Sequence, residues 1–181
     1  MNLPQQIQEY LGYPKLQLID VNTGLPEDES AFDKLSQAVV ISFLTAVFKA
    51  SRSKETAARI TGIRAGNELL NALFEKQEEI IERIAEYSNH STAITTEKLL
   101  ETASAFIVQL QKLLPADEAK KGEQLENLLT GERHEILRYL PADLKLGAYL
   151  DDKTLDDRTN KMEGPISSLL HKIENSFSTS N

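Results

Sequence analysis

The chain has 181 residues, a formal net charge of −8 and no cysteine, so it suits one ordinary domain and excludes disulfide frameworks, thiolate metal sites and thiol catalysis. Apolar residues make up 40% and charged residues 27%, as in soluble globular proteins, and the apolar set is led by Leu, Ile and Ala, which suit helices. We therefore expect one all-α domain over residues 1–177, a bundle of six to eight helices, with residues 178–181 as a frayed tail.

No segment predicts a membrane span or a signal peptide. The longest stretch without a formal charge, residues 35–48, is shorter than the roughly 18 apolar residues that cross a bilayer. The first 14 residues contain neither a basic n-region nor an apolar h-region. The excess of 28 acidic over 20 basic residues favours solubility and opposes unspecific association with nucleic acid or anionic membranes. These features predict an acidic, cytoplasmic protein.

The N-terminal half predicts three helical segments. A short helix follows Pro4, and an irregular connection leads to a helix over 31–51 that Ser30 and Asp33 can cap. The helix over 31–51 is apolar on nearly all sides, so we expect it at the centre of the fold. Residues 54–88 repeat apolar residues at heptad spacing and predict one long helix lying across the centre. Its outer face is acidic and carries Glu75, Glu78, Glu79, Glu82 and Glu86.

The C-terminal half predicts a second inner helix over 96–114, which Thr95 or Thr96 can cap and Pro115 ends. Two helices separated by Thr130 and Gly131 are expected next, and the last amphipathic helix begins at Pro165. The sequence Leu-Pro-Ala-Asp occurs at 114–117 and again at 140–143, each time after an apolar helix. This echo marks a helix end, a proline turn and a helix start. A looser echo aligns residues 31–51 and 60–74 with residues 96–114 and 125–141, at an offset of 64–67. A duplicated helical unit would explain the looser echo, and chance alignment of amphipathic helices would explain it as well.

No motif predicts catalysis or a cofactor. The three histidines, His90, His134 and His171, lack ligand spacing to one another, and the chain has no G-x-S-x-G elbow, P-loop or G-x-G-x-x-G after a strand. We therefore expect no metal, no cofactor and no enzymatic activity.

Two segments are candidate binding sites. The first is a set of small residues, Ala58, Gly62, Ala65 and Gly66. It predicts either a close crossing with another helix, with Ala46 and Ala50 as candidate facing positions, or a seam for a partner. The second is a basic stretch over residues 49–64, whose one acidic residue is Glu55. Its candidate contacts to a polyanion are Lys49, Arg52, Lys54, Arg59 and Arg64. Ala58 and Gly62 also fit the small and turn positions of a helix-turn-helix. That pattern nevertheless places Thr61, Glu68 and Asn71 where buried apolar residues belong.

Three functional hypotheses follow. The leading hypothesis is a non-catalytic protein–protein interaction module that works through the acidic face or the small-residue seam. In one version of this hypothesis the partner is a second copy and the protein is a dimer. The second is nucleic-acid binding through the basic stretch. We expect instead that these cations pair with carboxylates of neighbouring acidic helices. The third is a pocket for an apolar ligand among Phe43, Phe48, Phe74 and Phe106, which a large closed cavity would favour.

Overall fold

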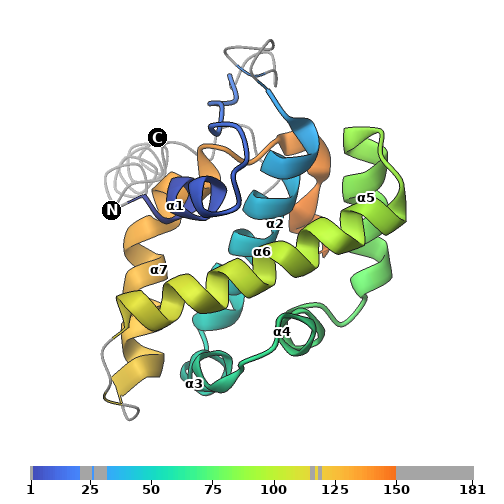
Figure 1. Ribbon diagram of the computed structural model, residues 1–181. Helices are drawn as coiled ribbons and strands as arrows, with labels where there is room; N and C mark the ends of the chain where they lie inside the picture. The colour runs from blue at the N-terminus through green and yellow to red at the C-terminus, as the bar shows by residue number, and fades with distance from the viewer. Residues whose placement is uncertain (1, 21–25, 27–31, 115–116, 118–119, 150–181) are drawn as a thin grey trace, which may run out of the picture.

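The computed structural model describes residues 2–20, 26, 32–114, 117 and 120–149, and every structural statement below refers to these residues (Figure 1). The elements in chain order are α1 (Leu3–Tyr10), α2 (Lys34–Ser51), α3 (Lys54–Gly62), α4 (Gly66–Leu73), α5 (Gln77–Ser88), α6 (Thr92–Leu113), α7 (Lys121–Leu137), a 3-10 turn η3 (Ala142–Leu144) and α8 (Leu146–Tyr149). No strand forms in this part of the chain, where Ile19 and Pro26 make an isolated β-bridge. The prediction of an all-α bundle is confirmed. Ser30, the helix predicted from Pro165 and the tail predicted over residues 178–181 lie outside the described residues.

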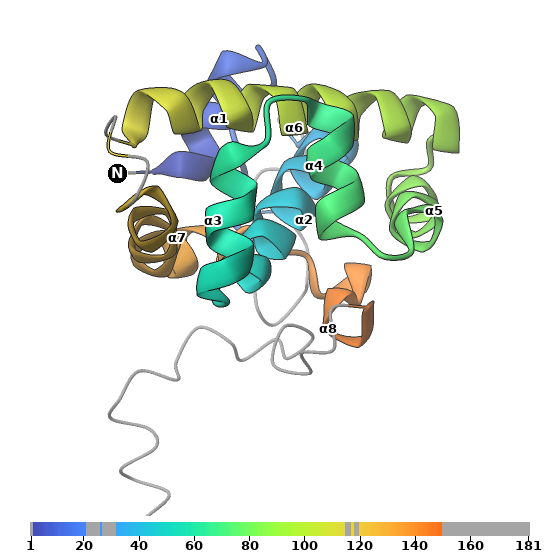
Figure 2. The same ribbon diagram turned by 90° about the horizontal axis from the view of Figure 1, so that it is seen from below.

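Helix α2 is the centre of the molecule, as predicted. Of its 18 residues, 15 are buried. The helix begins where the Asp33 side chain accepts a hydrogen bond from the Ser36 backbone N–H at 3.0 Å. Helices α1, α3, α5, α6 and α7 all pack on it, and the two ribbon views show them surrounding it (Figures 1 and 2). Because each large apolar side chain contributes about 1.5–3 kcal/mol when fully buried, the buried side chains of α2 are a major source of stability for the fold.

Helix α6 lies across one side of α2 and is not an inner helix, so that part of the prediction is wrong (Figure 1). It begins at Thr92, where Ser91 and not Thr95 or Thr96 supplies the cap. Its inner face buries Leu99 and Phe106, and the Phe106 ring packs edge to face on Phe43 with centroids 5.4 Å apart. Leu100 borders α4 and still remains 41% exposed, and Glu97 and Gln111 on the outer face are exposed. A helix with one open face is a covering layer.

The predicted long helix over 54–88 is wrong, because the chain breaks twice there. Extended backbone at Ile63 and Ala65 separates α3 from α4, and extended backbone at Phe74 precedes α5. A straight helix of that length would extend roughly 52 Å, far beyond the roughly 33 Å of α6, which already spans the molecule. Three short helices instead keep their apolar faces on the core, where α3 packs mainly on α7, α4 on α6 and α5 on α2.

Helix α7 runs without interruption through Thr130 and Gly131, so the two helices predicted there are one. A glycine inside a helix costs only about 0.5–1 kcal/mol, which the buried face of α7 offsets. The chain then turns at Pro141. The hypothesis of an internal duplication stays a prediction. The first of its two candidate units breaks at residues 63–65, whereas the corresponding part of the second is continuous in α7.

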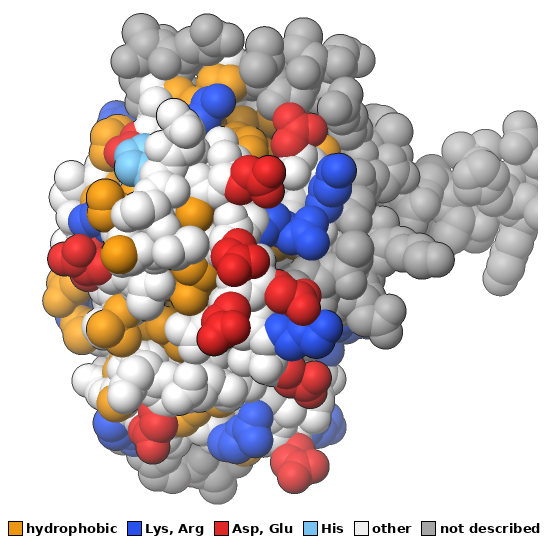
Figure 3. Space-filling model, turned by 90° about the vertical axis from the view of Figure 1, so that its right-hand side faces the viewer, with side chains coloured by type: hydrophobic (Ala, Val, Ile, Leu, Met, Phe, Trp, Pro, Cys, Tyr) orange, Lys and Arg blue, Asp and Glu red, His pale blue; other side chains and the backbone are white. Residues whose placement is uncertain are grey.

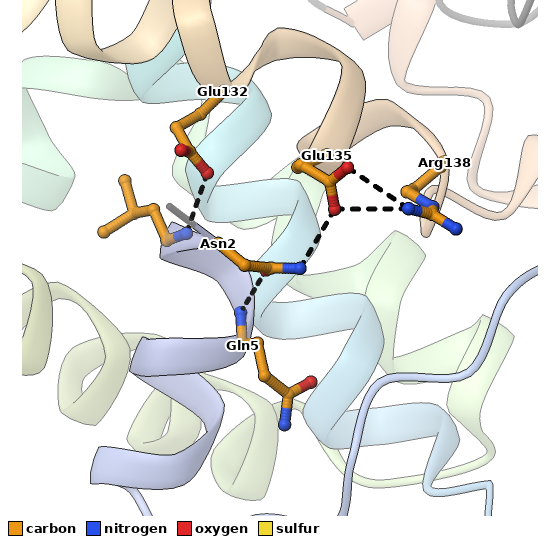
Figure 4. A network of polar contacts seen from close by, with 6 residues as sticks. Asn2, Gln5, Glu132, Glu135 and Arg138 are labelled. Atoms are coloured by element: carbon orange, nitrogen blue, oxygen red, sulfur yellow. Dashed lines mark hydrogen bonds and ion pairs between the residues drawn. The ribbon is translucent and has the colours of Figure 1, made fainter.

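A polar network fastens α1 to α7 (Figure 4). The Asn2 side chain accepts a hydrogen bond from the Gln5 N–H at 3.0 Å and donates one to Glu135 at 2.9 Å. The buried Glu132 carboxylate accepts the Leu3 N–H at 2.8 Å. A carboxylate at the start of a helix satisfies an amide that has no intrahelical partner and matches the positive end of the helix dipole. This network therefore fixes the first helix in place.

Candidate interaction surface

The four small residues do not form one stripe, because Ala58 and Gly62 belong to α3, Ala65 precedes α4 and Gly66 begins it. Two of them do lie at close helix contacts. A Cβ added to Gly66 would lie 3.2 Å from the Leu100 carbonyl oxygen of α6, and a Cβ added to Gly122 of α7 would lie 3.0 Å from the Ala58 nitrogen. Gly62 has open space around it and Ala65 is exposed. The close contacts of Gly66 and Ala58 are therefore with α6 and α7, and it stays a prediction that Ala46 and Ala50 face the small residues.

The five basic residues of 49–64 follow the end of α2, the length of α3 and the connection to α4. Lys49 is half-buried in the last turn of α2, and the other four side chains, Arg52, Lys54, Arg59 and Arg64, are exposed. None of the five forms an ion pair in the described structure, so the expectation that they pair with neighbouring acidic helices is wrong.

Two of these cations have a local structural role as helix caps. The Arg64 guanidinium donates to the carbonyl oxygens of Thr61 at 2.6 Å and Ile63 at 3.1 Å, at the end of α3. The Arg59 guanidinium donates to the Ala72 carbonyl at 3.5 Å, at the end of α4. Carbonyl groups at a helix C-terminus lack intrahelical donors, and cations there are favoured by the helix dipole. Arg59 and Arg64 therefore stabilise helix ends.

Helices α3 and α4 do not form a DNA-binding helix-turn-helix. In that motif the two helices cross steeply and the second presents its side chains to the major groove. Here both helices are seen end-on in Figure 1 and lie side by side in Figure 2, each packed on a different neighbour. The exposed residues in the first two turns of α4 are Asn67, Glu68 and Asn71, which supply no cation for a phosphate.

The acidic face predicted on one long helix lies on α5 and on the turn before it. We define the acidic surface as Glu75, Glu78, Glu79, Glu82 and Glu86, all of them exposed. Lys76 pairs with Glu79 at 2.9 Å, and both side chains stay at least half exposed. Figure 3 views this side of the molecule and shows acidic side chains gathered across its middle, with basic side chains beside them.

A hollow of about 650 Å³, open to solvent, adjoins the acidic surface at the turn from α4 to α5. Its lining combines carboxylates, amides and one aromatic ring and comprises Asn71, Phe74, Glu75, Lys76, Gln77, Glu78 and Glu79. The Phe74 side chain is only 3% exposed, and polar and apolar atoms contribute about equally to the walls. The sequence indicated the carboxylates of this surface but not the hollow, which exists only because the chain breaks at Phe74.

A cluster of ionisable side chains joins the segment after α1 to α6. The Tyr13 hydroxyl donates to Glu101 at 2.7 Å, and Lys98 approaches the same carboxylate oxygen at 2.9 Å. Burial and the Glu101 carboxylate raise the pKa of Tyr13, and the hydrogen bonds from Lys98 and Tyr13 lower the pKa of Glu101. A tyrosine that holds its proton this firmly is unsuited to act as a base. The cluster is a structural tie, and no sequence pattern connects residues 88 positions apart.

The four phenylalanines proposed for an apolar ligand are buried in the core. Phe43 and Phe106 pack on each other and fill the space that a ligand would need. A second hollow, of about 30 Å³, has room for about one water molecule. It lies between α3, α6 and α7, with Arg64 and Lys121 in its lining.

Among the described residues, no three His, Asp or Glu side chains gather in a group that could hold a metal ion. None of the helices in this part of the chain is both long and apolar enough to cross a membrane. Comparison of the chain with protein-family models, with curated proteins and with solved structures found no match in any of the three.

Proposed function

We propose that the protein is a non-catalytic helical interaction module that binds a protein partner on the acidic surface. The observation that carries the proposal is the row of exposed carboxylates beside an open hollow of about 650 Å³. Lys76 forms an ion pair with Glu79, and Arg83 lies on the same helix, so five carboxylates are set against two cations. Interfaces form where one partner fills a concave region of the other and the electrostatic potentials are complementary.

The free protein bears a cost at this surface that a cationic partner relieves. Glu78, Glu82 and Glu86 follow one another at a spacing of four residues on α5. Like charges at this spacing destabilise a helix by about 0.2–0.5 kcal/mol per pair, and Arg83, four residues after Glu79 and three before Glu86, offsets only part of this repulsion. Lys or Arg side chains of a partner can lay their aliphatic stems in the hollow and place their charges among the carboxylates. The expected partner surface is therefore basic.

The test is affinity capture from an extract of the source cells with three forms of the full chain. These are the wild type, a Glu75→Lys plus Glu78→Lys variant, and a control Glu9→Lys plus Glu97→Lys variant with the same change in net charge. Glu9 and Glu97 are exposed on α1 and α6, away from the hollow. Wild type and control should retain the same protein and the first variant should lose it. Equal retention by all three forms would refute the proposed function.

A further inference from the structure

We propose that a partner of the acidic surface is a second copy of this chain, whose Arg52 and Lys54 enter the hollow at the α4–α5 turn. This inference rests on the proposed function, because it names the partner of the same surface. It follows from how the structure distributes opposite charges over one side of the molecule.

The cations in question lie at the junction of α2 and α3, which we call the basic corner (Arg52 and Lys54). Both side chains are exposed and neither forms an ion pair or a hydrogen bond in the described structure. This distinguishes them from Arg59 and Arg64, whose guanidinium groups donate to carbonyl oxygens at helix ends. The side chains of the basic corner therefore make no polar contact within the described chain, and only the helix dipole at the end of α2, where Arg52 is the C-cap residue, favours one of the two charges.

The basic corner and the hollow belong to the same side of the molecule. Figure 2 looks onto the side formed by α3, α4 and the turn into α5, with α3 and that turn on opposite flanks of α4. The hollow carries Glu75, Glu78 and Glu79 against Lys76, and is acidic. Positive charge thus lies to one side of α4 and negative charge to the other.

Such a surface is complementary to itself. A two-fold rotation about an axis through α4 brings the basic corner of each copy opposite the hollow of the other, so every contact occurs twice. The exposed residues near the start and middle of α4 between the two regions are Asn67, Glu68 and Asn71. The two amides can donate and accept hydrogen bonds across the axis, and they can also donate to the Glu68 carboxylate of the other copy, which would otherwise face a like charge there.

The same arrangement disfavours a nucleic acid as the occupant of the basic corner. A long polyanion bound to Arg52 and Lys54 would lie along the side that also carries the acidic hollow, in a chain of net charge −8. The second copy matches both signs at once, whereas the polyanion matches only one.

The association should depend strongly on salt, because the charges concerned are exposed. Sedimentation equilibrium of the full chain at low ionic strength should show the average mass rising with protein concentration from 20.2 kDa toward twice that value. The rise should disappear at about 1 M NaCl, where the Debye length is about 3 Å. A mass that stays monomeric at low salt up to about 1 mM protein, a concentration that detects a free energy of association near −4 kcal/mol, would overturn the proposal.

A charge-swap experiment tests the pairing itself. Arg52→Glu plus Lys54→Glu, and separately Glu75→Lys plus Glu78→Lys, should each abolish self-association, whereas the Glu9→Lys plus Glu97→Lys control should keep it. Mixing the two swapped variants should restore a dimer containing one copy of each, because both contacts then regain opposite charges. Self-association of either swapped variant alone at the wild-type level, or failure of the mixture to associate, would overturn the proposal.

Two further outcomes separate this inference from the proposed function. If the chain is monomeric but the capture experiment still retains a basic protein that Glu75→Lys plus Glu78→Lys loses, the second copy is refuted and the interaction module stands. Micromolar binding of a labelled DNA duplex or single-stranded RNA at physiological salt, abolished by Arg52→Glu plus Lys54→Glu, would assign the basic corner to nucleic acid and overturn the proposal.

Discussion

Gly122→Ala should destabilise the protein, although alanine is the better helix former. Gly122 is the second residue of α7 and is buried against α3. An added Cβ would lie 3.0 Å from the nitrogen, 3.1 Å from the Cα and 3.2 Å from the Cβ of Ala58. Two of these atoms are backbone and cannot rotate away, so α3 and α7 would have to separate by a few tenths of an ångström. Overpacking of this kind costs about 1–3 kcal/mol, and the helix propensity of alanine returns at most about 1 kcal/mol.

The net expectation is a loss of about 0.5–2 kcal/mol in the free energy of unfolding, with a lower urea midpoint and an unchanged slope by circular dichroism. A loss of 1 kcal/mol lowers the melting temperature by about 2–4 °C in a chain of this size. Gly131→Ala is the matched control, because Gly131 lies inside the same helix with nothing within 4 Å of an added Cβ. It should stabilise by about 0.5–1 kcal/mol. If Gly122→Ala stabilises as Gly131→Ala does, the close α3–α7 contact does not exist.

Three further predictions concern packing, pH dependence and metal binding. Gly66→Leu should lower the urea midpoint by the equivalent of about 1–3 kcal/mol or more, because its side chain would collide with α6 at Ser104 and Leu100; an unchanged midpoint would contradict this contact. Tyr13→Phe should cost about 0.5–1.5 kcal/mol at pH 7. The pKa of Glu101 is lowered in the folded state, so the stabilisation from this carboxylate is present at neutral pH. It is lost as the pH falls below about 4.3 and through the folded pKa, and the stability difference between wild type and variant should shrink there. A difference that stays constant with pH would refute the Tyr13–Glu101 tie. Isothermal titration with Zn²⁺ should show no stoichiometric binding, because the histidines lack ligand spacing to one another. Tight binding that His134→Ala removes would contradict this expectation.

The sequence predicts the centre of the fold because α2 is apolar around nearly its whole circumference, a pattern that few surface helices share. Its start is predictable as well, since Asp33 is a strong capping residue and does cap it. The position of α6 is not predictable from the same criterion. Leu100 and Val108 widen its apolar face, but its place in the fold depends on which helices cover it. In the described structure α4 borders Leu100 without burying it, and Glu97 and Gln111 stay exposed.

The breaks in residues 54–88 are the main failure of prediction from the sequence. The heptad pattern continues across Ile63 and Phe74 because both side chains still face the core after the chain changes direction. A periodic pattern records which residues face inward, not whether one straight helix presents them. Gly62 and Gly66 flank the first break, where they favour interruption of the helix as much as close packing. The second break, at residues 74–76, contains no residue type that strongly disfavours a helix.

These breaks also explain why an acidic protein carries a basic stretch. Each break creates a helix C-terminus with carbonyl groups that need donors, and the cations of 49–64 gather where α2, α3 and α4 end. Lys49 lies in the last turn of α2, while Arg59 and Arg64 donate directly to terminal carbonyls. Arg52 is the C-cap residue of α2 and Lys54 is the first residue of α3, and neither exposed side chain donates to a carbonyl oxygen or forms an ion pair in the described structure. Among the five cations of 49–64, these two side chains are therefore the most available to an external carboxylate, and a charge swap there changes the surface without removing a hydrogen bond from a helix end.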